Sequence, residues 1–288
     1  MAADKIFDPI MLKLFPTIDY PDRDLLLGKL DMNKRHHGMC RVISYPGSGK
    51  TTLLTNYLNH EPSAVLITPS RNCRDKDLLI NICLALKYIP GKNLTANGLT
   101  LDLISHIKSC GKEIVFLIDE AQHLIPRSSN YNIDRLDLVR YIWDFTKLTT
   151  SVVFAGTNEL EGKIKRANEN LTNSQFYRRC LYLPMENVPI NSIAEFIHNV
   201  EKDFCVFFDK QAFENLKKRF LDTTHAGIGN SIEILSICMT GVYMGYWDEF
   251  YKSIEQGEEY NKAIKLFAGL PIKTITGAMI NEAAEMHP

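Results

Sequence analysis

A glycine-rich segment at residues 46–52 has the residue types that hold a polyphosphate. The residues expected at the phosphate groups are Pro46, Gly47, Ser48, Gly49, Lys50, Thr51 and Thr52. Glycines let the backbone curl until successive N–H groups point at phosphate oxygens, and a helix that starts directly after them adds partial positive charge. Lys50 would then reach the β- and γ-phosphates of ATP, and the Thr51 hydroxyl would bind the Mg2+ that bridges them. Ser44 stands where the usual pattern has a further glycine, a slight departure because serine resists positive φ.

An acidic pair further along the chain supplies the other half of such a site. Residues 113–119 form an apolar run without alternation, which is typical of a parallel strand buried on both faces. The run ends in Asp119, which we expect to hold the Mg2+, and Glu120 follows as the base that orients and deprotonates the attacking water. Either motif alone could be a surface turn or a solvated strand end. Their occurrence in one chain favours a site for ATP hydrolysis.

The expected elements alternate in the way that an α/β fold requires. The apolar run at residues 39–43 precedes the glycines, and residues 50–58 read as a helix after them. We therefore predict a P-loop fold in which a parallel five-stranded sheet lies between helices, followed by a small all-helical lid. The other expected strands are residues 64–68, 113–119, 151–158 and 180–185, and the expected lid helices are residues 190–204, 210–224 and 229–250. The predicted domain boundaries are an N-terminal extension at 1–38, a nucleotide-binding domain at 39–186, the lid at 187–250 and a C-terminal extension at 251–288.

Two further groups of polar residues follow expected strands. Thr157 and Asn158 end the third apolar run and could sense the γ-phosphate, with Asn158 the stronger candidate, although strand ends are often polar simply because loops are. Arg178 and Arg179 precede the last strand. They could reach the nucleotide of a neighbouring subunit, or they could cap a helix or pair with carboxylates within their own subunit.

These motifs resemble those of the AAA+ ATPases, and more narrowly those of the TniB, TnsC and MuB group of DNA transposition regulators. The resemblance covers roughly residues 35–240 and is strongest to the short TnsC proteins of CRISPR-associated transposons. Besides the ATPase motifs it rests on family-specific features between them. These are Cys40-Arg-Val-Ile, Asn72-Cys-Arg-Asp-Lys76-Asp-Leu, Asp119-Glu-Ala-Gln-His-Leu124, and Gly156-Thr-Asn-Glu-Leu160 followed by Ile164-Lys-Arg166.

The resemblance implies partners beyond the nucleotide. It predicts a protein that uses ATP and Mg2+ and assembles with itself into a ring, spiral or filament on duplex DNA. It also predicts a transposase partner and a target-selection protein of the TniQ type. Arg74, Lys76 and Thr95 are the expected DNA contacts, and the Lys76 and Thr95 positions match DNA-contacting ones in the TnsC proteins. On sequence alone, a short charged loop of this kind is usually just solvated.

Composition limits where DNA could bind. The chain of 288 residues has a formal net charge of −1, so any DNA contact must be local. The seven cysteines show no Cys-x-x-Cys spacing, and we expect reduced, mostly core thiols. No apolar stretch approaches the roughly twenty residues that span a bilayer, and a signal-peptide pattern is lacking. We expect a cytoplasmic protein with no membrane partner.

Three alternatives stay open. A replication initiator or helicase loader is the strongest rival, although the last forty or so residues are short for its usual winged-helix domain. Secretion-associated ATPases share the architecture but generally add a membrane span. A scaffold that binds ATP without hydrolysing it is favoured by the lid, where Ile232 takes the place of the usual arginine and predicts slow turnover. The aromatic group of Trp247, Phe250 and Tyr251 near the end of the lid is expected to be core.

Overall fold

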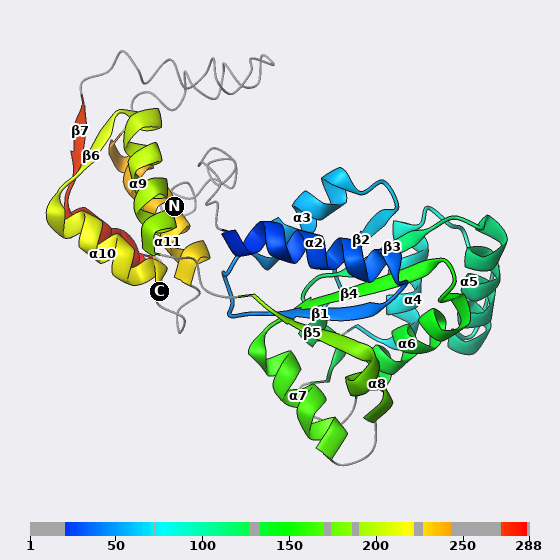
Figure 1. Cartoon of the computed structure of the whole chain (residues 1–288). Coiled ribbons are helices and arrows are strands. Elements are labelled where there is room, and N and C mark those ends of the chain that lie inside the picture. The colour runs from blue at the N-terminus through cyan, green and yellow to red at the C-terminus, as the bar shows by residue number, and fades with distance from the viewer. Residues whose placement is uncertain are drawn as a thin grey trace. The chain divides into compact units, whose positions relative to one another are not determined.

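The chain folds into two compact units, each of which we describe by itself (Figure 1). The computed structural model describes residues 21–71, 73–126, 133–169, 174–185, 190–221, 227–242 and 272–286. The α/β unit comprises Pro21–Tyr45 and Gly49–Glu186, and the helix-rich unit contains the described residues from 190 onward together with Pro46–Ser48. The predicted aromatic group at 247–251 lies outside the described residues.

A parallel five-stranded sheet forms the centre of the α/β unit. The strands are β1 (Met39–Ile43), β2 (Ala64–Ile67), β3 (Ile114–Ile118), β4 (Thr150–Gly156) and β5 (Cys180–Pro184). Their order is β2-β3-β4-β1-β5, and every neighbouring pair is parallel. The three central strands β1, β3 and β4 are buried along their whole length, as their unbroken apolar runs predict. The predicted α/β fold with helices around a five-stranded parallel sheet is confirmed.

Helices connect and cover these strands. They are α2 (Pro21–Arg35), α3 (Lys50–His60), α4 (Asp75–Ala85), α5 (Ala96–Cys110), the 3-10 turn η1 (Ala121–Leu124), α6 (Asp134–Thr146), α7 (Asn158–Glu169) and α8 (Ser174–Arg179). Helix α2 packs against β1, β4 and α3, so residues 21–35 belong to this unit and not to a separate extension that ends at residue 38. The buried Leu26 and Leu30 explain this, because they place an apolar stripe of α2 against the sheet.

The sheet order decides where functional residues meet. Because β4 lies between β3 and β1, the carboxyl ends of these three strands are neighbours at one edge of the sheet. Loops at the carboxyl ends of parallel strands are where ligands bind in open α/β folds. The glycine loop follows β1, the acidic pair follows β3, and Thr157 follows β4. The topology therefore gathers motifs that are far apart in the sequence.

The helix-rich unit also contains a small sheet. Its elements are α9 (Ile190–Phe204), β6 (Val206–Phe208), α10 (Lys210–Phe220), α11 (Gly227–Val242), β7 (Lys273–Ile275) and α14 (Gly277–Met286). Strands β6 and β7 pair in parallel, and α14 packs against α10 and α11. The structure thus adds a two-stranded sheet to the predicted all-helical lid and joins residues 272–286 to it, where the sequence predicted a separate C-terminal extension. Each strand has three residues and pairs with a segment distant in sequence, so neither strand can be predicted from a local sequence pattern.

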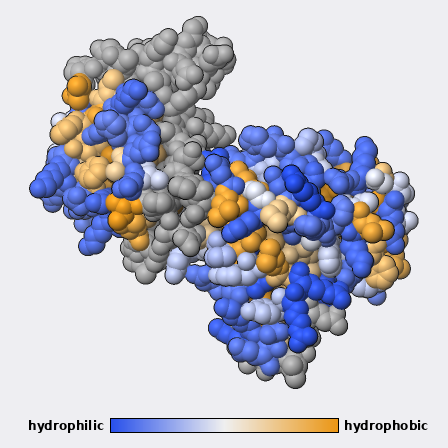
Figure 2. All heavy atoms as spheres, in the orientation of Figure 1, coloured by the Kyte–Doolittle hydropathy of each residue, from blue (hydrophilic) through white to orange (hydrophobic). Residues whose placement is uncertain are grey.

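Hydrophilic side chains predominate on the face of both units seen in Figure 2, and most cysteines lie in the interior. Figure 2 shows hydrophilic side chains over much of the visible face of both units, with apolar patches between them. Five of the seven cysteines are buried, in line with the expected core thiols, and Cys110 is exposed. Among the described residues, none of the helices has both the length and the apolar character needed to cross a bilayer.

Candidate nucleotide-binding site

The glycine loop between β1 and α3 has the backbone that anion binding requires. Gly47 (φ 70°) and Gly49 (φ 89°) both adopt the left-handed region, and Gly49 caps the amino end of α3. Ser44 has no positive φ, so its replacement of the usual glycine introduces no strain of that kind. Its buried hydroxyl lacks a hydrogen-bond partner within the described chain. A loop of this shape ending at a helix amino terminus fits a phosphate group.

Lys50 is buried at the start of α3 with its charge directed to the loop. Its Nζ donates hydrogen bonds to the carbonyl oxygens of Tyr45 (2.6 Å) and Ser44 (3.4 Å). Burial lowers the pKa of Lys50, and the negative charges of Glu120 and Asp119 oppose that shift. A buried ammonium group surrounded by carbonyls and carboxylates suits a polyanionic ligand that supplies further negative charge.

Thr51 and Asp119 bring two oxygen ligands together across the edge of the sheet. The Thr51 hydroxyl donates to Asp119 Oδ2 at 2.7 Å, which joins the first turn of α3 to the end of β3. Asp119 is buried, with 3% of its surface exposed. A hydroxyl next to a carboxylate is a donor set that Mg2+ accepts, since this ion prefers hard oxygen ligands and keeps several waters. The residues present therefore fit the expected magnesium ion.

Glu120 adopts a left-handed backbone conformation beside this pair. Its φ is 49°, and its N–H donates to Asp119 Oδ1 at 2.9 Å. A non-glycine residue in this region carries strain of about 1–3 kcal/mol, and such strain persists where surrounding contacts enforce it. Here the side-chain amide of Gln122 donates to Glu120 Oε2, and Gln122 Oε1 accepts from the N–H of Thr157 at 3.3 Å. Sequence reasoning did not assign a role to Gln122, although its place two residues after Glu120 was the available signal.

The end of β4 is shaped around Gln122. A Cβ added at Gly156 would lie 2.4 Å from Leu160 Cδ2 and 3.2 Å from Gln122 Oε1, so a side chain there would displace both. Thr157 is half-buried and contacts Gln122 through its backbone, whereas Asn158 is exposed at the first residue of α7. The structure thus brings both sensor candidates to the site's edge and joins Thr157 to the acidic pair.

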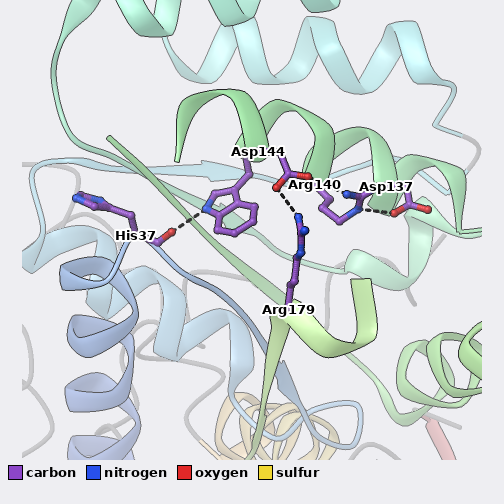
Figure 3. A network of polar contacts seen from close by, with 6 residues as sticks. His37, Asp137, Arg140, Asp144 and Arg179 are labelled. Atoms are coloured by element: carbon purple, nitrogen blue, oxygen red, sulfur yellow. Dashed lines mark hydrogen bonds and ion pairs between the residues drawn. The ribbon is translucent and has the colours of Figure 1, made fainter. Parts of the chain in front are cut away.

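The two candidate arginines differ in their surroundings. Arg179 Nη1 donates to Asp144 Oδ1 at 2.7 Å, and Asp144 Oδ2 accepts from Arg140 Nη1 at 2.8 Å (Figure 3). Arg140 continues the chain of charges to Asp137, and these contacts tie α8 to α6. The neighbouring Arg178 is exposed, and within the described residues it makes no hydrogen bond or ion pair. Arg179 therefore pairs with a carboxylate of its own subunit, which was one of the two alternatives that the sequence left open.

A buried arginine in β1 holds the surrounding elements together, and sequence reasoning named it only within the family motif. The Nε of Arg41 lies 2.6 Å from Glu161 Oε2 in α7, and its guanidinium also donates to the carbonyl of Cys180 in β5. Rings of Tyr177 and Tyr182 lie 4.9 and 5.3 Å from its guanidinium carbon. Burial alone would lower the pKa of Arg41, but the hydrogen bond and the charge of Glu161 raise it above its ordinary value.

The expected DNA contacts lie on two different helices. Arg74 and Lys76 are exposed at the start of α4, which follows the carboxyl end of β2. The N–H of Arg74 donates to Asp77 Oδ2 at 3.1 Å, which caps the helix. Thr95 is exposed at the start of α5, where its hydroxyl accepts from the N–H of Gly98 at 3.1 Å. The basic residues of α4 thus share the ligand edge of the sheet, and Thr95 has a capping role of its own.

Comparison with known proteins decides the fold family. Cdc6p of Pyrobaculum aerophilum superposes with a TM-score of 0.59 at 16% identity, over 88% of this chain and 67% of that one. The ADP form of the ORC2 protein of Aeropyrum pernix superposes with a TM-score of 0.58 at 10% identity, over 98% of this chain and 72% of that one. Residues 33–164 match the family model of the AAA domain. The fold is that of an AAA+ P-loop ATPase.

The AAA match covers the nucleotide site but not every candidate residue. It includes the glycine loop, the acidic pair and the end of β4, whereas Arg178 and Arg179 lie beyond it. One curated relative, general secretion pathway protein A of Aeromonas hydrophila, is 27% identical over 180 residues. That alignment spans 60% of this chain and about a third (32%) of the relative, so the likeness concerns only part of a longer protein. In the helix-rich unit, Ile232 lies in α11, at the position where the sequence predicted that the lid arginine is missing.

Proposed function

We propose that this chain is an ATP-hydrolysing AAA+ protein that assembles on duplex DNA in the ATP state and presents that DNA to a transposase. The observation that carries the ATPase part is the meeting of Lys50, Thr51, Asp119 and Glu120 at one edge of the sheet. The AAA domain match and the ATPase fold support ATPase activity in general. The transposition role rests on the resemblance to TnsC proteins. The transposase and a TniQ-type target-selection protein are therefore proposed as partners on that resemblance alone.

Each residue of the site has a task in ATP hydrolysis. The glycine-loop N–H groups and Lys50 bind and orient the phosphates, and Thr51 with Asp119 would hold Mg2+, which supplies charge neutralisation when bound. Glu120 accepts the proton of the attacking water, and Gln122 fixes the direction of its carboxylate. Thr157 and Asn158 would report the γ-phosphate to α7. With Ile232 in place of a lid arginine, we expect slow turnover that makes hydrolysis a switch for disassembly.

Arg178 is the residue that we expect to reach the neighbouring subunit's nucleotide. Arg179 is already bound to Asp144, whereas Arg178, in the same short helix α8, is exposed. Mixing two inactive variants tests this. Subunits with Arg178→Gln supply an intact base, and subunits with Glu120→Gln supply an intact Arg178, so mixed assemblies regain turnover at some interfaces. Mixtures of Arg179→Gln subunits with Glu120→Gln subunits serve as the control. If turnover recovered only in the Arg179→Gln mixture, the residue that reaches the neighbouring nucleotide would be Arg179 and not Arg178.

Binding of a labelled random-sequence duplex tests the function as a whole. Anisotropy is recorded with an ATP analogue, with ADP and without nucleotide, while light scattering reports particle size. Tight binding that needs the analogue and coincides with large assemblies supports the proposal, because an interface completed by the γ-phosphate links assembly to nucleotide state. No duplex binding in any state would exclude the transposition role and leave the ATPase assignment standing.

A replication initiator or helicase loader is the second candidate. It is favoured by the fold that this chain shares with Cdc6p and ORC2, although a likeness at 16% and 10% identity concerns the fold alone. The same assay with single-stranded DNA separates the two candidates. Preference for single strands, or loading of a helicase without large assemblies on duplex, would favour the loader. A secretion role, as in the name of the curated relative, predicts no nucleotide-dependent binding to either form of DNA.

A further inference from the structure

The short turn η1 touches the hydrolytic carboxylate on one side. Gln122, its second residue, donates to Glu120 Oε2 and accepts from the N–H of Thr157. The side chain thus links the acidic pair after β3 to the end of β4. Any shift of η1 along the sheet edge would change the direction of the Glu120 carboxylate.

The same turn is fastened to the segment that leads into α4. His123 Nδ1 lies 3.1 Å from the carbonyl oxygen of Pro69, and since a carbonyl only accepts, Nδ1 carries the hydrogen in this contact. Arg135, in the first turn of α6, spans both segments. Its Nη1 donates to the carbonyl of Leu124 at 3.4 Å, and its Nε donates to Asp75 Oδ1 at 3.2 Å. Asp75 is the first residue of α4 and the direct neighbour of Lys76.

Packing prevents η1 from absorbing a movement by itself. Ala121 and Leu124 are fully buried, and both belong to the core of the α/β unit. Protein interiors are close-packed and transmit displacement instead of dissipating it. A displacement of the start of α4 therefore reaches η1 through Arg135 and His123, and it reaches Glu120 through Gln122.

We infer that Gln122, His123 and Arg135 form a coupling element, through which a ligand on the start of α4 changes the position of Glu120 and so the rate of ATP hydrolysis. Identification of that ligand as duplex DNA rests on the proposed function. The coupling itself rests on the contacts of η1. The same contacts join the acidic pair to the start of α4, so a nucleotide that moves Glu120 should also alter the start of α4.

Arg135 and Asp75 offer a test that separates coupling from simple charge. Arg135→Gln removes a positive charge near Lys76 and leaves the negative charge of Asp75 without its Arg135 partner, so it weakens duplex binding. Asp75→Asn removes a negative charge and strengthens it. Both changes break the same bridge. Electrostatics alone predicts opposite effects of the two variants, whereas loss of coupling predicts the same effect on turnover.

Arg140→Gln is a matched control. Arg140 lies on the same helix as Arg135, has a nearly equal exposed side-chain fraction (20% against 21%), and pairs with Asp137 and Asp144 without touching η1. Asp75 is 56% exposed, so its replacement does not threaten folding, which thermal unfolding of all three variants checks.

The first measurement is the ratio of ATP turnover at saturating duplex to turnover without DNA. We expect Arg135→Gln and Asp75→Asn each to move this ratio toward one by about 2- to 30-fold, while Arg140→Gln keeps the parent value. Equal ratios in all variants, opposite changes in the two bridge variants, or a parent that binds duplex without any change in turnover would overturn the inference.

The second measurement does not depend on DNA binding. Amide hydrogen exchange of residues 73–83 is recorded with and without an ATP analogue in the DNA-free protein. The analogue should slow exchange in the parent and in Arg140→Gln, and this response should be lost in both bridge variants. No response in the parent would refute the coupling. If the parent fails to bind duplex but the exchange pattern holds, the proposed function fails and the coupling element stands.

Discussion

The buried ion pair between Arg41 and Glu161 makes a sharp prediction about stability. The two side chains are 3% and 8% exposed, and Arg41 Nε lies 2.6 Å from Glu161 Oε2. At that separation and an effective dielectric constant of about 20, the attraction is about 6 kcal/mol, most of which offsets the loss of hydration of both charges. Glu161→Gln leaves the guanidinium buried without its counter-charge. We therefore expect a loss of about 3–5 kcal/mol in the free energy of unfolding.

Replacing both partners should cost far less than replacing one. Arg41→Met combined with Glu161→Leu removes both charges and fills similar volume, so its stability should lie within about 1 kcal/mol of the parent or above it. Urea unfolding followed by the fluorescence of Trp143, in a Trp247→Phe background, reports the α/β unit alone. Trp143 suits this purpose because its indole N–H donates to the carbonyl of His37 at 2.8 Å within that unit (Figure 3).

Two outcomes would refute this reasoning. A loss below about 1 kcal/mol in Glu161→Gln would mean that water reaches the guanidinium, contrary to its burial. A double variant that loses as much stability as the single variants Arg41→Met and Glu161→Leu lose together would mean that Arg41 acts through packing on Tyr177 and Tyr182 and not through its charge.

Three further predictions concern the site and its edge. Phosphate binding needs a protonated Lys50, and burial lowers the pKa of that side chain. ATP affinity should therefore be constant at neutral pH and fall as the pH rises through a value below 10.5, the ordinary pKa of lysine. Titration with a fluorescent ATP analogue between about pH 7 and 10 measures this dependence. Gly156→Ala should cost about 1–3 kcal/mol in urea unfolding, because its Cβ would overlap buried atoms. Gly162→Ala in α7 should be neutral or stabilising, because its Cβ would meet only Arg166 Nη2 at 4.0 Å, an ordinary contact. Lys76→Gln should weaken duplex binding and flatten its salt dependence by about one unit of slope, while Lys112→Gln, which removes the same charge before the amino end of β3, should leave the slope unchanged.

Local chemistry was sufficient to predict the α/β unit and the glycine loop within its chain segment. The glycines and Lys50 stand next to each other, and the apolar runs of β1, β3 and β4 mark buried parallel strands without reference to any other segment. The beginning of α3 at Lys50 and of β5 at Cys180 follows from the same patterns. These features depend on interactions between residues close in sequence, and a periodic pattern records such interactions directly.

Tertiary structure alone decided which polar residues act together. Gln122 contacts Thr157, Arg135 contacts Asp75 and Arg41 contacts Glu161, and each pair comes from separate elements. The same is true of the pairing of β6 with β7, which turned a predicted tail into part of the helix-rich unit. No spacing rule connects such residues, because their distance depends on the order of the strands and the packing of helices upon them.

The two candidate arginines illustrate the difference between the two sources of information. Arg178 and Arg179 are neighbours of identical chemistry, and the sequence by itself determined only that two guanidinium groups precede β5. The structure binds Arg179 to Asp144 of α6 and leaves Arg178 exposed, because a side chain's partner depends on which face of a helix meets a neighbouring element. The sequence determined the chemistry available at the site, and the packing of the helices decided which of those groups are already bound within the subunit.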